Sequence, residues 1–516
     1  MVPSLPVRNL TSTAITIKRV ERFQDPNTLQ SKNTGYSFGL KDTRVISPTS
    51  PQLGEHAQSF KHQDLDITLA PFESYTLHQP GPEREGNTPV TSSTTIRLTI
   101  ETPGGERYRI DANPSYSQKS SQPLTALSPD PSTSYTALFH PSKPVAHLTI
   151  HANHLPNYAK WMAKLPDSLP LSALSIPGTH NSHTHYRALP SARCQAVDIK
   201  TQLDNGIRFL DIRVQPVHAK DTSKKDLYLV HGAFAISLTG QKYFEPILQQ
   251  CYDFLSANPT ETILISLKRE GVGFATDEHL ARILDEHYIA PKASCWYTDS
   301  KLPYLGDVRG KLVLIRRYNT ATTDTTAPGL DATAWPSNPT HALFPQPTSP
   351  SHQHTFCLQD FCEVLIPEAI TQKVQYSNEH LVRAADCVHH IPGVNTDRLN
   401  PVPPGPLYLN YLSGSNFWKR ACWPDQIAST VNRSMEEWIC AGHHLVEPEV
   451  SPRHPDEMVV SGDVGEGVRR AKSGDGSTGV VVMDYVGDHG DWDLVRLVVG
   501  MNMGVLMKMQ ENEVGR

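Results

Sequence analysis

The chain has 516 residues, more than one ordinary domain holds, so we expect two domains. Its net charge of −6 lacks the strongly basic character of a nucleic-acid-binding protein, and 38% hydrophobic residues are enough for a substantial core. No run of about 18 apolar residues is present, which excludes a transmembrane helix of the usual kind.

Two further features bear on the compartment. The eight cysteines are scattered without the paired spacing of a metal site, which favours thiols in a reducing environment. The first residues show no basic region followed by an apolar run, so we expect no secretory signal. A cytoplasmic location is the resulting prediction.

Residues 1–150 are predicted to form an all-β accessory domain. Short alternating or β-branched segments separated by turn residues predict strands at 14–20, 65–69, 95–100, 108–110 and 145–150. The turn Pro103-Gly104-Gly105 predicts a hairpin between the third and the fourth of these strands. Several short strands with such turns are typical of a β-sandwich.

From residue 157 to 516, strand patterns alternate with helical patterns. Strands are expected at 171–176, 207–213, 227–232, 262–268, 311–317, 355–360, 407–412 and 479–484. Helices are expected after Tyr243, after a Thr276 cap, and from near Pro424 and Asp491. Mobile loops are expected at about 319–355 and 447–479.

Nearly every one of these eight strands ends in a polar or charged residue. The residues are His180, Arg213, His231, Lys268, Arg317, Asp360, Asn410 and Asp484. Eight apolar strands interleaved with helices predict an α/β fold, a distorted (β/α)8 TIM-type barrel, whose active site lies where the strands' carboxyl ends meet.

These side chains suit the cleavage of a phosphodiester. One neutral histidine can take a proton from an attacking hydroxyl, and a second, protonated histidine can give one to the leaving oxygen. Arg213 can stabilise charge on the phosphoryl oxygens, and a carboxylate such as Asp484 can orient a histidine.

At these positions the chain resembles the phosphatidylinositol-specific phospholipase C family, in particular its bacterial-type X domains. The matching stretches, in consistent order, are SIPGTHNS (175–182), IRFLDIR (207–213), LVHG (229–232), NPTETILISLKRE (258–270), LGDVRGKLVLIRRY (305–318), LQDF (358–361), NYLSG (410–414) and VVVMDY (480–485). The resemblance implies a lyase or phosphoric diester hydrolase of lipid metabolism that acts on phosphatidylinositol at a membrane surface. Diacylglycerol and inositol 1,2-cyclic phosphate would be its products.

The resemblance also implies roles for single residues. His180 would be the general base, held by Asp484, and His231 the general acid. Arg213 would contact the phosphate, with Asp211 beside it. Lys268, Arg317 and Asp360 would bind inositol hydroxyls, although Lys268 and Arg317 are equally well explained as salt-bridge partners at a barrel rim. Glu270 is expected to be structural.

The resemblance implies no metal or other cofactor. Arg213 stands where the Ca²⁺-dependent animal relatives have an acidic metal ligand. Asn181 stands where the bacterial enzymes have aspartate, and because the animal relatives use asparagine there for Ca²⁺, a metal-dependent alternative stays open. Cys362 replaces a tyrosine that flanks the inositol ring. These two departures favour, as the second hypothesis, a catalytically weakened protein that binds phosphoinositides or inositol phosphates.

Overall fold

The computed structural model describes residues 4–24, 53, 57–78, 94–113, 119–141, 146–153, 155, 157–320, 327–345, 354–446 and 468–514. They form two compact units. The first comprises Met1–His154 together with Ile439–Ser473, and the second comprises Leu155–Trp438 together with Gly474–Arg516. A segment near the carboxyl end of the chain therefore belongs to the first unit, although the sequence prediction assigned it to the barrel.

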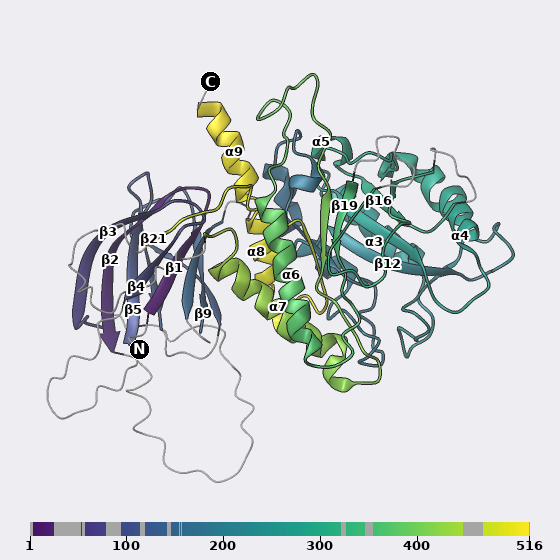
Figure 1. Ribbon diagram of the computed structural model, residues 1–516, viewed down its shortest axis with the longest axis horizontal. Helices are drawn as coiled ribbons and strands as arrows, with labels where there is room; N and C mark the ends of the chain where they lie inside the picture. Colours follow the sequence, from purple (N-terminus) through teal and green to yellow (C-terminus); the bar gives the residue numbers. More distant parts are fainter. Residues whose placement is uncertain are drawn as a thin grey trace, which may run out of the picture. The chain divides into compact units, whose positions relative to one another are not determined.

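The first unit consists of two β-sheets (Figure 1). One has the order β21-β4-β1-β10-β9-β7 and the other β3-β2-β5-β6-β8. The strands are β1 (Ser4–Leu10), β2 (Ile15–Gln24), β3 (Lys61–Leu69), β4 (Ser74–His78), β5 (Thr94–Glu101), β6 (Arg107–Ala112), β7 (Ser120–Pro123), β8 (Thr125–Ala126), β9 (Tyr135–His140), β10 (His147–Ala152) and β21 (Val468–Arg469). Apolar side chains from both sheets form one buried cluster, which includes Leu5, Ile17, Leu98 and Leu148.

The second unit is built on a mostly parallel sheet with the order β15-β16-β14-β12-β11-β22-β20-β19-β18. Its strands are β11 (Ile176–Thr179), β12 (Phe209–Pro216), β13 (Leu227–Leu229), β14 (Ile263–Arg269), β15 (Trp296–Tyr297), β16 (Leu312–Arg317), β17 (Leu330–Asp331), β18 (Ala342–Pro345), β19 (His354–Gln359), β20 (Leu407–Tyr411) and β22 (Val480–Met483). Only β18 is antiparallel to its neighbour along this path. Among the described strands no pairing joins β15 to β18, so the sheet is not closed by hydrogen bonds.

Helices accompany these strands (Figure 1). They are α2 (Ile199–Asp204), α3 (Phe244–Ala257), α4 (Asp277–Ile283), α5 (Leu305–Val308), α6 (Ala369–Asp386), α7 (Pro424–Ala441), α8 (Asp493–Gly500) and α9 (Met503–Val514). The expected α/β character is confirmed. Thr276 caps α4 by accepting a hydrogen bond from the His279 amide. No helix in the described part of the chain is long and apolar enough to cross a membrane.

Two predicted barrel strands were wrong. Residues Leu171–Ala173 form a 3₁₀ turn, because the Leu174 amide bonds back to the Leu171 carbonyl, and the strand begins only at Ile176. The strand predicted at 227–232 is the short β13, which pairs antiparallel with β12 in a hairpin. Its apolar residues are buried like those of a barrel strand, and the sequence pattern does not distinguish the two arrangements.

The two predicted mobile loops fall partly outside the described residues. Residues 321–326, 346–353 and 447–467 lie outside them. Within the first loop, residues 327–345 contain two short strands, β17 and β18, and otherwise consist of turns and bends. Within the second, residues 468–479 begin with β21, which pairs with β4.

Candidate active site at the carboxyl ends of the strands

His180 directly follows β11, and a glycine lets that strand approach its neighbour closely. A Cβ atom at Gly178 would lie 2.8 Å from the Cβ of Phe209 on β12, so a larger residue would push the strands apart. The His180 amide donates to the carbonyl of Met483 at the end of β22. Neighbouring strands on both sides thus set the position of the histidine.

The two ring nitrogens of His180 have different partners. Nδ1 lies 2.9 Å from Oδ1 of Asp484. Nε2 lies 2.9 Å from a guanidinium nitrogen of Arg213 and 3.0 Å from the amide nitrogen of Asn181, which are both donors. One proton therefore lies between Nδ1 and Asp484, and Nε2 carries a lone pair. Burial, followed by the Arg213 charge, keeps the pKa of His180 well below its ordinary value, so the ring is neutral at pH 7.

A second histidine, His231, faces the first. The ring centroids are 6.2 Å apart and the planes are nearly perpendicular. Nδ1 of His231 donates to the carbonyl of Ala192 at 2.9 Å, which leaves Nε2 as the nitrogen able to exchange a proton with a ligand. Burial and Arg213 lower the pKa of His231 as well.

Arg213 is the charged centre of the site. It donates to both carboxylate oxygens of Glu270 at 3.1 Å and to Asp211 at 3.3 Å. Glu270 also accepts from Lys268 at 3.3 Å and from the Gly232 amide at 3.0 Å. Although burial acts in the opposite direction, Arg213 and Lys268 hold the pKa of Glu270 down at about 2.

Arg317 and Asp360, the remaining two residues predicted to bind substrate, both contact the side chain of Trp335. The Arg317 guanidinium lies 3.7 Å from the centroid of the Trp335 ring, and the indole N–H of Trp335 donates to Asp360 at 3.0 Å. Arg317 also lies 3.6 Å from Asp211. Burial raises the pKa of Asp360.

The structure therefore brings the predicted residues into one continuous network. His180, Asn181, Asp211, Arg213 and Asp484 contact one another directly or through a shared partner. Lys268 joins through Glu270. His231 makes no hydrogen bond to these residues within the described contacts, but it faces His180 across the site.

Sequence reasoning missed two members of this network. Glu270, which was expected to be structural, contacts Arg213, Lys268 and Gly232 within the site. The sequence could have predicted the contact between Lys268 and Glu270, because residues two positions apart in an extended strand lie on the same face. No sequence pattern indicated Trp335 as a site residue, because it lies in the Thr- and Pro-rich stretch that was predicted to be a loop.

Several buried polar atoms of the site lack a hydrogen bond within the described part of the chain. They include Nε of Arg213, Oδ1 of Asn181 and Oδ2 of Asp484. Buried donors and acceptors without partners are costly, and they occur where a ligand completes the bonding. An arginine with a spare N–H between a neutral base and a second histidine suits the binding of an anion and the transfer of protons. The donor atoms of His180, Cys194 and Asp484 also lie close enough together to hold a metal ion.

Comparison with known proteins identifies part of the second unit. Residues 168–318 match the family model of the phosphatidylinositol-specific phospholipase C X domain. A 1-phosphatidylinositol phosphodiesterase of Listeria monocytogenes is 33% identical over 172 residues, which are 31% of this chain and 49% of that protein. The human PI-PLC X domain-containing protein 1 is 28% identical over 152 residues, 23% of this chain and 45% of that protein. The chain thus spans about half the length of the curated relatives it matches.

Among solved structures, the phosphatidylinositol-specific phospholipase C from Listeria monocytogenes aligns with 67% of this chain and 99% of its own. The TM-score is 0.43 and the sequence identity is 21%.

Proposed function

We propose, from the X-domain match of residues 168–318 as the premise, that this chain is a phosphodiesterase that resembles phosphatidylinositol-specific phospholipase C. Its substrate would be phosphatidylinositol, and its products diacylglycerol and inositol 1,2-cyclic phosphate. The observation that carries the proposal is the neutral His180, set between Asp484 and Arg213, with His231 facing it.

The proposed reaction uses both histidines. Nε2 of His180 takes the proton of the inositol 2-hydroxyl, whose oxygen attacks phosphorus as the bond to the glycerol oxygen breaks. Nε2 of His231, protonated, gives its proton to that leaving oxygen. Asp484 stabilises the imidazolium that forms at His180.

Arg213 takes two positions in this scheme. Without substrate it donates to Nε2 of His180, and with substrate it would turn its N–H groups to the phosphoryl oxygens and free the base. Lys268, Arg317 and Asp360 would bind the inositol hydroxyls. Trp335 would keep Arg317 and Asp360 in place, since it contacts both.

The charge arrangement supports chemistry that needs no Ca²⁺. Ca²⁺ takes about six to eight oxygen ligands, mainly carboxylates. Here Asp211 and Glu270 are already neutralised by Arg213, Arg317 and Lys268. The positively charged guanidinium of Arg213 would stabilise the phosphate in place of a bound Ca²⁺.

Exposed apolar side chains in loops that follow the strand ends support action at a lipid surface. Val272 and Phe274 follow β14 and are 81% and 93% exposed. Trp418, in the loop after β20, is 89% exposed, and Phe234 stacks on Phe417 with centroids 4.1 Å apart. Aromatic and apolar groups of this kind are suited to the membrane interface. We place the protein at the periphery of a membrane on the cytoplasmic side.

The first unit is proposed to be a β-sandwich accessory domain, because its two sheets share one apolar cluster. The second unit is proposed to be a distorted barrel, because eight of its strands, from β15 to β19 in the sheet order, form one parallel ladder.

The proposal is tested with vesicles that contain phosphatidylinositol, in EDTA and separately in Ca²⁺. Cyclic inositol phosphate should form equally in both. His180→Ala should lower the rate roughly 10²–10⁴-fold. His185→Ala, a change to a histidine of the same loop that makes no contact with Asp484 or Arg213 in the described hydrogen bonds, should leave the rate nearly unchanged. Product only with Ca²⁺ would overturn the metal-independent scheme.

The second candidate is a protein that binds the same headgroup without turnover. It is favoured by Asn181, whose uncharged amide donates to the base nitrogen where the bacterial relatives are expected to have a carboxylate. Vesicle binding that depends on Arg213, with no product from phosphatidylinositol in either buffer, would establish this function and exclude the first.

A further inference from the structure

A pair of histidines lies on one face of the six-stranded sheet of the first unit. Along β10, Leu148 and Ile150 belong to the buried apolar cluster, so the alternating residues His147, Thr149 and His151 lie on the opposite face. His147 is directly opposite His140 of β9 in the antiparallel register. Their rings stack with centroids 4.6 Å apart and planes inclined by 19°.

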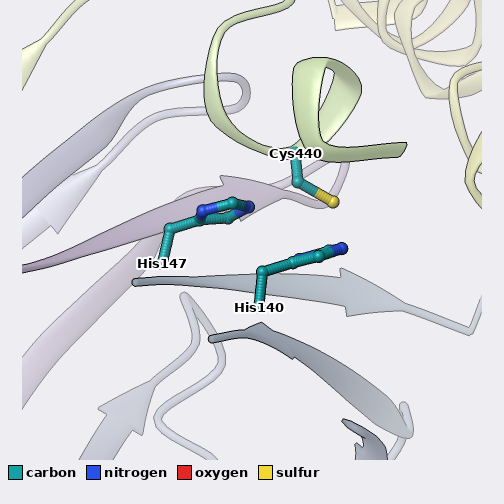
Figure 2. A group of neighbouring side chains, drawn as sticks. All are labelled: His140, His147 and Cys440. Atoms are coloured by element: carbon teal, nitrogen blue, oxygen red, sulfur yellow. The ribbon is translucent and has the colours of Figure 1, made fainter. Parts of the chain in front are cut away.

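A cysteine from a distant part of the chain covers this pair. Cys440 is in the last turn of α7, in the segment 439–473 that belongs to the same unit. Figure 2 shows its sulfur directed toward the two rings. The hydroxyl of Thr149 lies 3.6 Å from the sulfur.

A buried arginine holds the cysteine in this position. Arg8 of β1 donates to the carbonyl of Ile439 at 2.6 Å, to that of Cys440 at 3.1 Å, and to that of His443. These carbonyls are at the helix end, where the helix supplies no partner for them, so the arginine both satisfies and fixes the turn. The placement of Cys440 over the histidines is therefore enforced by the first unit itself.

We propose that His140, His147 and Cys440 bind a d¹⁰ transition-metal ion, Zn²⁺ or Cu⁺. Each residue offers one donor atom, and these atoms all lie within 4.8 Å of one another. The side chains are almost completely buried, with exposures of 1%, 8% and 0%. Two imidazoles and a thiolate select soft or borderline ions and not Ca²⁺ or Mg²⁺, which require oxygen ligands.

Binding would release the thiol proton of Cys440 to solvent and form bonds from the sulfur and two ring nitrogens to the metal. No electron is transferred. With two neutral imidazoles and one thiolate, the site would have net charge zero around Cu⁺ and +1 around Zn²⁺. The zero charge suits a buried position beside Arg8, whereas Zn²⁺ would also need a fourth ligand.

The role of this metal would be structural. It would join the end of α7 to strands that lie about 300 residues earlier in the chain, and so close a very long loop between two segments of the first unit. The proposal does not depend on the function proposed for the second unit, since no residue is shared between the two sites.

The second unit offers a matched control. His341, Cys357 and His380 also form a group with metal-ligating atoms close together, but His341 is exposed. A third group includes the catalytic His180 with Cys194 and Asp484. Replacing one cysteine at a time therefore tells which group binds an added ion.

The test is a titration of the full reduced chain with Co²⁺, as a spectroscopic substitute for Zn²⁺, and in a separate arm with Cu⁺. Bound metal is counted after dialysis, and thermal unfolding is followed with and without metal. We expect stoichiometric binding, a thiolate-to-cobalt charge-transfer band, and a higher unfolding temperature with metal. Cys440→Ser should abolish the band and weaken binding more than about tenfold. Cys357→Ser and Cys194→Ser should retain both.

The wild-type titration keeps the test informative even where Cys440→Ser folds poorly. Absence of stoichiometric binding of both ions to the folded wild-type chain would overturn the proposal. So would a charge-transfer band that survives Cys440→Ser but is lost with Cys357→Ser or Cys194→Ser. His140→Gln gives a second check, because it keeps the thiol and should still weaken binding.

Discussion

Two arginine–glutamate pairs join the same two strands, β12 and β14, at opposite ends, and they differ in how completely they are bonded. Arg208, just before β12, pairs with Glu261 at 2.9 Å, and both side chains are 0% exposed. Its other N–H groups donate to the carbonyls of Leu203, Ile207, Tyr158 and Ala159. At the other end, Arg213 pairs with Glu270 at 3.1 Å, but its Nε has no hydrogen bond among the described residues.

The difference separates a pair that is fully bonded from a pair that keeps donors free for a ligand. Arg208 is satisfied and closed to solvent, as is typical of the end of such a sheet that determines stability. Arg213 keeps unused donor capacity, and its side chain and that of Glu270 are 14% and 18% exposed. The carboxyl end of the strands is therefore equipped to receive an anion, and the amino end is not. The following changes test this contrast, from the largest expected effect to the smallest.

Glu261→Ala should have the largest effect on stability. It leaves Arg208 as an uncompensated buried charge, which typically costs about 3–5 kcal/mol of unfolding free energy. Denaturant titration measures the loss, and the activity of the folded fraction should not change. Glu270→Ala is the matched control and should cost clearly less stability, because solvent reaches that pair. Equal losses at both ends would contradict the contrast.

Glu270→Gln should have the opposite effect to Glu261→Ala. The enzymatic rate should fall, and the unfolding free energy should stay nearly unchanged. The guanidinium of Arg213 loses its main partner and its orientation, and misplacement of a positioning group by about 1 Å can cost about 10²-fold in rate. Steady-state kinetics on phosphatidylinositol vesicles should show the fall mainly in kcat. Glu261→Gln, measured in the same assay, serves as the comparison. An unchanged rate for Glu270→Gln would return this residue to a purely structural role.

Asn181→Asp should raise the rate by roughly tenfold, if the weakened acid limits turnover. Asn181 and His231 each lie 3.9 Å from the sulfur of Cys194, so a carboxylate at position 181 would favour the protonated form of His231. An opposite charge at about 4–6 Å shifts a pKa by roughly 1–3 units. Initial rates on vesicles at several pH values would detect the change. No increase at any pH would favour the binding protein over the enzyme.

The pH profile should show the smallest effect, a displacement toward acid. His180 must be neutral to act as a base, and burial with Arg213 lowers its pKa, so activity persists below pH 6.5. His231 must be protonated to act as an acid, and its pKa is lowered too, so activity declines early as the pH rises. The maximum of kcat/KM should lie on the acid side of about pH 6.5. A maximum well above neutrality would contradict these assignments.

Much of the second unit could be predicted from its residues, and the reasons are local. Apolar runs that end in charged residues located β12, β14, β16, β19, β20 and β22, because a buried parallel strand must be apolar along its length. The same rule failed for β13, since a short antiparallel strand beside β12 is buried just as well. The site residues were found because each lies at or just after the carboxyl end of a predicted strand, whereas Trp335 lies in a stretch with no periodic pattern.

By itself, the sequence determined which residues end the strands, and hence that histidines, cations and carboxylates would gather at one edge of the sheet. Only the tertiary structure decided pairings such as Glu270 with Arg213 and Trp335 with Arg317. It also decided that Cys440 would lie over His140 and His147. Strand patterns depend on neighbouring residues, but contacts between residues hundreds of positions apart depend on strand order and register, which no local pattern encodes.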